Sequence, residues 1–358
     1  MSNLKRTPLF DDHVSLGARL VDFAGWEMPV QYEGVIAESK AARNSAGMFD
    51  VSHMGRTWFR GEKTIELLEV LTTNDISKLQ DGNSQYSLLC YENGTCVDDI
   101  IVYRISSDVF RVVINASNRE KDLEWMKSHN TFNVGISDET EKTAMIAVQG
   151  PDACNIVQEL SSDDLLTIQR FSGKNSVVSG CEVFIARTGY TGEDGFELIC
   201  SANDASNIWN SLFRKGVAPC GLASRDVLRV EAGLPLYGHE LSDSINPIEA
   251  GLGWVVSKTK NFVGSEAINK IREEGVSRKL MGIRMSSKAV PREGYEVRVD
   301  GENAGTISSG VFSPVLDCGI AFAFIQSVYA KESTKCNVMI REKPFEAEIV
   351  NKRFLVKN

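Results

Sequence analysis

The sequence predicts an α+β protein with a separate all-β domain at its C-terminal end. Up to about residue 276, segments with a helical period alternate with short runs of β-branched and aromatic residues. From residue 277 onward only short β runs remain, and Gly, Asn and charged turns separate them. That last stretch indicates a small barrel or sandwich. The length of 358 residues favours two or three domains, because single cores stop growing near about 250–300 residues.

The elements follow from local patterns. Helical signals occur at about 34–46, 62–72, 117–129, 151–160, 203–215, 221–232 and 264–274. Strand signals occur near 56–60, 86–91, 97–105, 109–115, 143–149, 176–187 and 195–200. Ser117 and Glu120 have the spacing of a capping box, which predicts a helix start. The dipeptide Ser179-Gly180 predicts a hairpin turn within its strand segment.

Composition excludes several classes of function. A net charge of −9 argues against nucleic acid as the main partner, because phosphate binding needs a basic footprint. The sequence shows neither a secretory signal nor an apolar run of about 18 residues, so we expect a soluble cytoplasmic protein without membrane contact. The eight cysteines form no C-x-x-C pair and the four histidines lie far apart. We therefore expect buried free thiols and no metal site.

The segment TCVDDIIVY, residues 95–103, raises a chemical question. Its composition is that of a strand, yet two adjacent aspartates lie at its centre. Side chains alternate across a strand, so Asp98 and Asp99 point to opposite faces, both of which are otherwise apolar. A carboxylate on a covered face costs several kcal/mol unless it is paired, hydrogen-bonded or at the strand's mouth. The pattern indicates a buried carboxylate with a purpose, but alternation does not choose between the two.

Six longer stretches together resemble one known family. They are TPLFDDHVSLGARLVDFAGWEMPVQY near the start, GMFDVSHMG at 47–55, NGTCVDDIIVY at 93–103, ARTGYTGEDGFEL at 186–198, GLASRDVLRVEAGLPLYGHEL at 221–241 and NPIEAGLGWVV at 246–256. In this order and at this spacing they resemble the aminomethyltransferases of the glycine cleavage system, the T-proteins. The resemblance extends from about Thr7 into the C-terminal barrel.

The resemblance implies a three-domain, cloverleaf-like α+β fold that ends in an antiparallel β-barrel. The domains it implies are residues 1–53 with 140–165 and 217–276, residues 54–139 with 166–216, and residues 277–358. It also implies a reaction in which a lipoyl-carrying H-protein presents an aminomethyl group. The one-carbon unit passes to tetrahydrofolate as co-substrate, ammonia is released, and methylene-tetrahydrofolate forms without a metal.

The family's functional positions can be matched one by one. Asp99 matches the catalytic second aspartate of the DD pair. Tyr190 and Glu197 match the residues that hold the pterin, where a carboxylate can accept two bonds from an amine and a ring N–H. The other matched positions, which line the folate cleft or the entry of the lipoyl arm, are Met54, Tyr86, Ile101, Asn115, Arg225, Trp254 and Arg292.

Structural interpretations compete with these assignments. Met54 and Trp254 could be ordinary core residues, and Tyr190 could be an ordinary tyrosine of a strand. Asp99 and Glu197 could belong to buried ion pairs, and Asp98 is expected to be structural. Arg225 and Arg229 are one turn apart on the helix expected at 221–232, so either could pair with a nearby acid.

The sequence also departs from the family pattern in two places. Many relatives have histidine where Ser39 stands and glycine where Thr95 stands, so the turn before the catalytic strand should be slightly stiffer. Two other classes of function compete with the main interpretation: a folate-dependent demethylase on the same fold, and a folate-binding accessory protein for RNA modification or iron–sulfur repair. The family motifs GMFDVSHMG and RTGYTGEDGFE favour neither of them.

Overall fold

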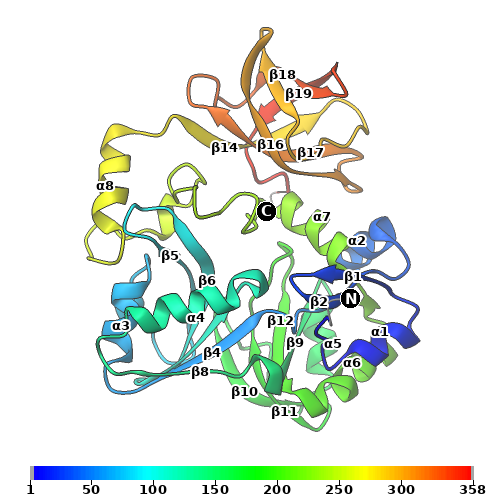
Figure 1. Cartoon of the computed structure of the whole chain (residues 1–358). Coiled ribbons are helices and arrows are strands. Elements are labelled where there is room, and N and C mark those ends of the chain that lie inside the picture. The colour runs from blue at the N-terminus through cyan, green and yellow to red at the C-terminus, as the bar shows by residue number, and fades with distance from the viewer. Residues whose placement is uncertain (1–3, 356–358) are drawn as a thin grey trace. The chain divides into compact units, whose positions relative to one another are not determined.

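The computed structural model describes residues 4–355, and these residues form two compact units. Unit 1 runs through Leu71 and takes in Asp75–Ser87 and Ile100–Arg225. Unit 2 consists of Thr72–Asn74, Leu88–Asp99 and the chain from Asp226 onward. Figure 1 traces the elements of both units. The expected cloverleaf-like domains include residues 1–3 and 356–358, which lie outside the described residues.

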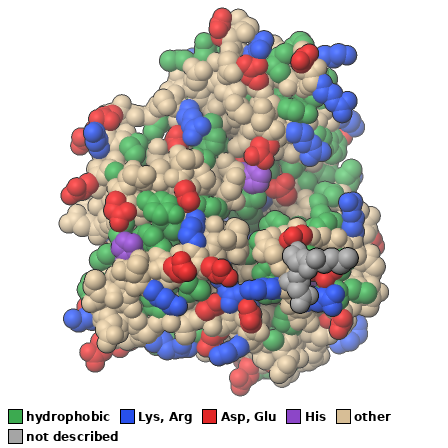
Figure 2. Space-filling model, viewed as in Figure 1, with side chains coloured by type: hydrophobic (Ala, Val, Ile, Leu, Met, Phe, Trp, Pro, Cys, Tyr) green, Lys and Arg blue, Asp and Glu red, His purple; other side chains and the backbone are tan. Residues whose placement is uncertain are grey.

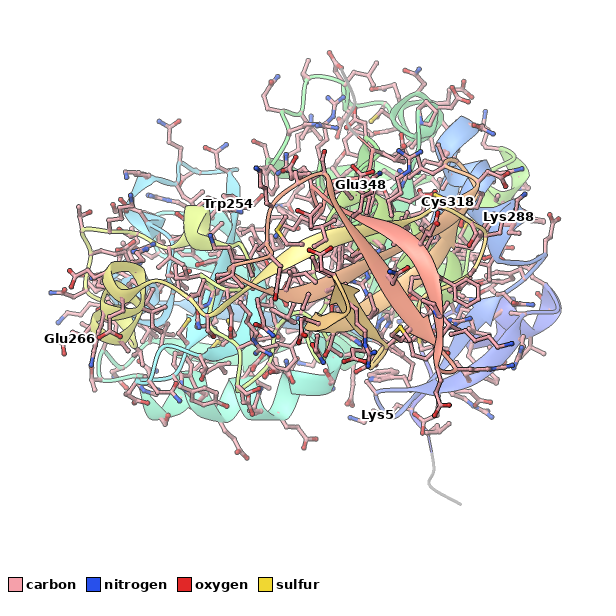
Figure 3. All side chains as sticks on the ribbon, turned by 90° about the horizontal axis from the view of Figure 1, so that it is seen from above. Lys5, Trp254, Glu266, Lys288, Cys318 and Glu348 are labelled. Atoms are coloured by element: carbon pink, nitrogen blue, oxygen red, sulfur yellow. The ribbon has the colours of Figure 1, made fainter. Side chains whose placement is uncertain are left out.

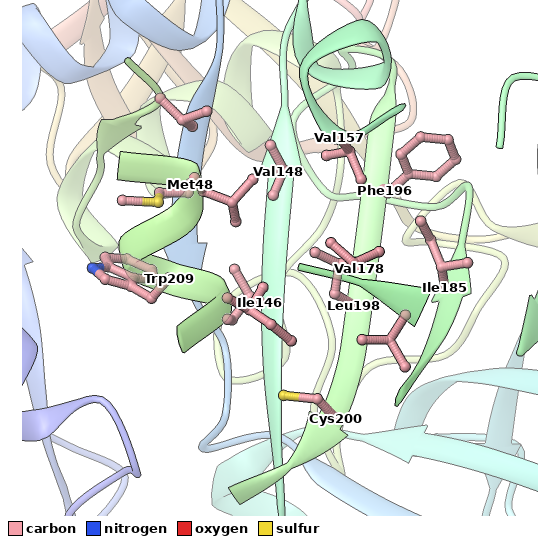
Figure 4. Packing of buried hydrophobic residues seen from close by; sticks show 14 of the residues in the cluster. Met48, Ile146, Val148, Val157, Val178, Ile185, Phe196, Leu198, Cys200 and Trp209 are labelled. Carbon is pink, nitrogen blue, oxygen red and sulfur yellow. The ribbon is translucent and has the colours of Figure 1, made fainter. Parts of the chain in front are cut away.

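Unit 1 contains a six-stranded sheet covered by two helices. In spatial order the strands are β10 (Gly173–Val178), β11 (Cys181–Ala186), β12 (Gly195–Ser201), β9 (Thr143–Gln149), β3 (Gly47–Asp50) and β13 (Ala218–Pro219). All neighbours are antiparallel except β13 and β3. The two helices are α5 (Ala153–Gln158) and α6 (Ala205–Arg214). Residues 205, 208, 209 and 212 of α6 are buried, as an apolar stripe of helical period requires. Figure 4 shows Trp209 of that stripe in the core with Ile146 and Leu198 of the sheet.

A second sheet has the order β5-β6-β7-β4-β8. Its strands are β5 (Ser84–Cys90), β6 (Cys96–Ser106), β7 (Val109–Ile114), β4 (Gly55–Arg60) and β8 (Gly135–Asp138). The remaining elements are α1 (Phe10–Ser15), the hairpin of β1 (Arg19–Phe23) and β2 (Trp26–Gln31), α2 (Val35–Asn44), α3 (Thr64–Leu71), α4 (Arg119–Ser128), α7 (Leu222–Ala232) and α8 (Ser265–Glu274). The boundary between the two units falls within β5, β6 and α7.

The all-β end of the chain is a closed barrel within unit 2. Its strands are β14 (Arg278–Met285), β17 (Cys318–Gln326), β16 (Glu302–Ser313), β15 (Glu296–Val299), β18 (Thr334–Ile340) and β19 (Lys343–Val350). The barrel closes because β14 pairs with both β17 and β19. Its interior is filled mainly by Val, Ile and Ala side chains, together with Met285 and Cys336. Closure removes unpaired strand edges and decides between the two expected forms in favour of the barrel.

Most expected elements are confirmed, with one local exception. Each of the seven predicted helices occurs within about three residues of its expected bounds. The Ser179-Gly180 hairpin is confirmed, with φ of 53° and 79° at the two residues. The capping box is wrong, because α4 begins after a 3-10 turn, Asn118 takes the N-cap position and no side-chain cap bond forms there. The pattern did not predict α1, β1, β2, β3, β8 or β13, which are short.

The expected division into three domains stays a prediction, although two strand groups bear on it. Strand β14 begins directly after the expected boundary at 276/277. Strand β9 was expected in the first domain and β10–β12 in the second, yet all four pair in one sheet. These pairings favour a boundary elsewhere than between residues 165 and 166.

The surface and the cysteines complete the description. All eight cysteines are buried and free, as expected. Basic and acidic side chains are interspersed on the face shown in Figure 2, which offers no continuous basic footprint. Among residues 4–355, no helix has both the length and the apolar character needed to cross a membrane.

Candidate active site

Strand β6 contains both aspartates of the VDD motif. Asp98 is completely buried, whereas Asp99 is only partly buried. The next two residues repeat this alternation, because Ile100 is buried and Ile101 is partly exposed. The face of β6 with Asp99 is therefore more accessible at this end than the face with Asp98. A carboxylate that acts on a bound molecule needs such access, so Asp99 stays the predicted catalytic residue.

Strand pairing within unit 1 aligns three further predicted residues. β7 pairs antiparallel with β6 on one side and with β4 on the other. Ile101 pairs with Val113 of β7, two residues before Asn115. Gly55 of β4 pairs with Ile114, which places Met54 beside Asn115. All three predicted residues are partly buried. They form a semi-exposed edge at the ends of adjacent strands, where a ligand can contact them.

Glu197 on β12 is held through one oxygen only. Its exposed fraction is 7%, and the Thr188 hydroxyl donates to its Oε2 at 2.5 Å. The Tyr103 hydroxyl donates to the same oxygen at 3.5 Å and lies 3.1 Å from Thr188 Oγ1. Burial and the nearby Glu197 charge raise the pKa of Tyr103. Among residues 4–355, none donates a hydrogen bond to Oε1 and no cation forms an ion pair with this carboxylate. The ion-pair interpretation is therefore wrong for Glu197, and Oε1 is available to a ligand.

Arg225 and Tyr190 lie near Glu197, and we call these three residues the Glu197 cluster. The Arg225 guanidinium lies over the Tyr190 ring, 4.9 Å from its centroid. Its Nη1 is buried without a hydrogen-bond partner among the described residues. Burial lowers the pKa of Arg225, whereas Glu197 and Tyr190 oppose that shift. A buried arginine N–H without an acceptor is rare unless a ligand supplies one, so this group suits an anionic or carbonyl oxygen.

The other arginine of α7 has a structural role. Arg229 forms ion pairs with Asp226 at 2.8 Å and with Glu240 at 2.7 Å, and it is 1% exposed. The expectation that one of the two arginines pairs with a nearby acid is confirmed for Arg229. Arg225 forms no ion pair with any described residue.

The loop 187–194 contains the predicted pterin tyrosine, and Gln149 of β9 holds it in place. The Gln149 side chain donates to the Thr188 carbonyl at 3.0 Å and accepts from the Thr191 hydroxyl at 3.0 Å. Gly189 passes so close that a Cβ there would lie 1.8 Å from Gln149 Oε1. The glycine is required by this close approach, which fixes the loop against β9.

The structure places the remaining predicted residues on a strand, a 3-10 turn and a loop. Tyr86 is partly buried on β5. Trp254 lies on the 3-10 turn Gly253–Val255 with an exposed fraction of 70%, so the core interpretation is wrong for it (Figure 3). Arg292 is exposed in the loop between β14 and β15. Trp254, Arg292 and Asp99 belong to unit 2, whereas the other predicted residues belong to unit 1.

The two departures from the family pattern have simple local consequences. The Ser39 hydroxyl donates to the Val35 carbonyl of its own helix at 2.7 Å, and its exposed fraction is 1%. Thr95 is tied into its turn by donating to Asn93 Oδ1 at 2.7 Å.

Sequence reasoning missed Arg111, which joins the two sheets of unit 1. Its guanidinium lies between two rings, 4.2 Å from the centroid of Trp58 and 4.9 Å from that of Phe184. Burial lowers the pKa of Arg111 to about 10, so it is still a cation at neutral pH. An arginine within the apolar run VFRVVI was the available signal.

His53 of the SHMG motif was also missed. Its exposed fraction is 5%, its Nδ1 has no hydrogen-bond partner among the described residues, and its ring packs edge-on against Phe23 at 5.4 Å. Burial lowers the pKa of His53 to about 4; Asp50 opposes this shift, and Arg225 and Arg56 add to it. The imidazole is therefore neutral at physiological pH.

This buried histidine predicts a specific loss of stability in acid. In the unfolded chain His53 takes up a proton below its ordinary pKa of 6.5, but in the folded protein only near 4. The free energy of unfolding should therefore fall as pH drops from 6.5 to 4, by about 3 kcal/mol for this group. Urea unfolding of the parent and of His53→Phe between pH 4.5 and 8 measures it. Parallel pH profiles for the two proteins would contradict the prediction.

The Glu197 cluster offers three groups to a ligand: one open carboxylate oxygen, one buried guanidinium N–H and an aromatic ring. This combination suits a flat heterocycle with donor and acceptor edges. No group of three or more His, Cys, Asp or Glu residues suited to a metal ion occurs between residues 4 and 355.

Comparison with known families places this architecture. The family model of the GCVT N-terminal domain matches residues 9–260. The family model of the glycine cleavage T-protein C-terminal barrel domain matches residues 278–355. The α+β body and the closed terminal barrel are thus those of a protein of the glycine cleavage T-protein type.

Individual relatives match this chain over 90% or more of their own length. An aminomethyltransferase of Symbiobacterium thermophilum is 46% identical, covering 98% of this chain and 97% of the relative. One from Thermotoga petrophila is 49% identical, with 90% of each chain covered. The crystal structure of the glycine cleavage system aminomethyltransferase T from Bartonella henselae matches with a TM-score of 0.93 and 31% identity, covering 99% of this chain and 98% of that one. The chain belongs to the aminomethyltransferase family.

Proposed function

We propose that the protein transfers a one-carbon unit from an aminomethyl-dihydrolipoyl H-protein to tetrahydrofolate. The carbon–nitrogen and carbon–sulfur bonds of the aminomethyl group break, and two bonds form from that carbon to two folate nitrogens. The nitrogen leaves as ammonia, and the lipoyl sulfur leaves as a thiol. The products are methylene-tetrahydrofolate and the reduced lipoyl arm. Membership of the family along the whole chain is the observation that most supports this proposal.

Glu197, Tyr190 and Arg225 are the proposed pterin-binding residues. Oε1 of Glu197 can accept bonds from the pterin amine and ring N–H, while Thr188 holds the other oxygen in place. Arg225 has an N–H that lacks an acceptor, and a pterin carbonyl or the folate tail can provide one. Met54, Tyr86, Ile101 and Asn115 are the proposed lining of the rest of the folate site.

Asp99 is the proposed catalytic residue. Its carboxylate can orient a folate amine, take up its proton, and stabilise the positive charge that develops as ammonia leaves. Its partial exposure at the accessible face of β6 supports this role. Trp254 and Arg292 are the proposed contacts of the lipoyl arm, and both side chains are exposed.

A direct assay tests the function. Purified protein is mixed with aminomethyl-loaded H-protein and tetrahydrofolate, and ammonia release is followed over time. We expect fast release that depends on both the folate and the loaded carrier. Equal release without tetrahydrofolate, or none with it, would contradict the proposal. Offering N-methylated amino acids instead of the carrier tests the demethylase alternative in the same assay.

A further inference from the structure

Helix α2 contains none of the predicted substrate-binding residues, yet it buries two charged side chains. Glu38 has an exposed fraction of 2%, and the side chain of Arg43 one of 8%. The two lie on one short helix, five residues apart. Buried charges are costly unless several well-placed partners compensate them. What these partners are shows what the helix does.

The Glu38 carboxylate accepts four hydrogen bonds that join two separate segments. Its Oε1 accepts from the backbone N–H groups of Tyr32 at 2.6 Å and Gly34 at 3.1 Å. Its Oε2 accepts from the Gly221 N–H at 2.8 Å and the Ser224 hydroxyl at 2.9 Å. One side chain thus ties the chain that precedes α2 to the first turn of α7.

That first turn determines where Arg225 lies. The backbone N–H of Arg225 donates to the Gly221 carbonyl at 3.1 Å, so Gly221 fixes the start of the turn. Gly221 also packs against the backbone at the end of β2, where a Cβ would lie 2.4 Å from the Val30 carbonyl carbon. The turn therefore has little freedom to shift as long as Glu38 holds it.

The other end of α2 holds the loop with the predicted pterin tyrosine. Arg43 Nη1 donates to the Thr191 carbonyl at 2.7 Å and forms an ion pair with Glu193 at 2.7 Å. The side chain of Glu193 is 1% exposed. Thr191 directly follows Tyr190 in the chain. The bond from Arg43 to Thr191 therefore ties the backbone beside Tyr190 to α2.

We propose that helix α2 fixes the distance between Arg225 and Tyr190. Glu38 is the positioning residue for Arg225, and Arg43 is the positioning residue for Tyr190. The helix acts as a brace that keeps the guanidinium and the ring 4.9 Å apart without touching the ligand. This inference rests on the proposed function, because it gives Arg225 and Tyr190 their value as folate-binding residues.

The substitution Glu38→Gln tests the brace at atomic level. The amide is nearly the same size, but its NH₂ group must face either two backbone N–H donors or the pair at Gly221 and Ser224. The Ser224 hydroxyl can turn and accept, whereas the Gly221 N–H cannot, so the start of α7 should loosen. We expect tetrahydrofolate to bind about tenfold more weakly by calorimetry, and its KM to rise similarly. The turnover number at saturating folate should stay within about twofold of the parent.

Two further variants separate positioning from general stability. Asp50→Asn is a matched control, since this buried carboxylate of unit 1 also accepts several bonds, from Thr7 at 2.6 Å, His13 at 2.9 Å and the Ser52 N–H at 2.9 Å. It should lower the melting temperature and leave folate affinity unchanged. If it weakened folate binding as much as Glu38→Gln, the positioning role would be refuted. Ser224→Ala keeps the carboxylate and removes one bond, so it should fold and show a smaller loss of affinity in the same direction; unchanged affinity would also refute the role.

A double-mutant cycle with Arg225→Ala distinguishes this inference from the proposed function. If Arg225→Ala leaves folate affinity unchanged, the proposed folate role of Arg225 fails. If Arg225→Ala weakens binding and Glu38→Gln adds its full effect in that background, the proposed function stands and the brace is refuted. The brace predicts little or no additional loss, because Glu38 acts through the guanidinium that is already gone.

Discussion

Replacing Glu197 by glutamine should weaken tetrahydrofolate binding about ten- to a hundredfold. The carboxylate lies at 7% exposure with Oε2 bonded to Thr188, and no described residue donates to Oε1. Glutamine can present only one acceptor oxygen and no charge, so either the Thr188 bond or the ligand bond is lost. A charge-assisted hydrogen bond of this kind contributes about 1.5–3 kcal/mol, which corresponds to that change in dissociation constant.

Calorimetry with tetrahydrofolate measures the effect directly. Glu182→Gln is the matched control, because Glu182 is exposed on the neighbouring strand β11 and loses the same charge without touching the cluster. Thr188→Val should have an intermediate effect, since it frees the carboxylate but keeps its charge. Parent-like affinity in Glu197→Gln would remove this residue from the proposed folate site.

The sequence predicted the elements that long periodic patterns specify. Helix α6 was predictable because its apolar residues at 205, 208, 209 and 212 recur at helical spacing and face one core. Strand β3 was not, because its four residues, GMFD, are buried on both faces and too short to show a period. The capping box failed for a related reason: a 3-10 turn shifted the helix start by one residue and removed the expected bond.

The candidate site was predictable only in part. The residues of the GYTGEDGFE and SRD motifs could be singled out by resemblance, and the structure brings Tyr190 and Arg225 into contact. Their supports could not be found that way, because Glu38 and Arg43 act on backbone groups about 150–190 residues away in the sequence. A local pattern contains no information about such long-range partners. A buried glutamate on a short helix looks, from sequence alone, like an exposed one.

Replacing Asp99 by asparagine should reduce turnover by about 10²–10⁴, the usual span for one positioned acid–base group. Asparagine keeps the shape and one acceptor oxygen but loses the charge and the basicity that the proposed reaction needs. Stabilisation of the charge on departing ammonia should suffer most, because such interactions are strong where water is excluded. Folate affinity and melting temperature should change little, since Asp99 is only partly buried.

The neighbouring aspartate provides the matched control, one residue away on the same strand. Asp98 is completely buried, and burial, Asp243 and, to a smaller degree, Asp98 raise the pKa of Tyr237. Asp98→Asn should therefore lower the melting temperature clearly while the remaining folded enzyme keeps most of its turnover. Both variants are compared for melting temperature, tetrahydrofolate affinity and ammonia release from loaded H-protein. Loss of turnover in Asp98→Asn together with parent-like turnover in Asp99→Asn would place the catalytic carboxylate on the opposite face of β6, because alternation along a strand allows only one of the two to reach the bound folate.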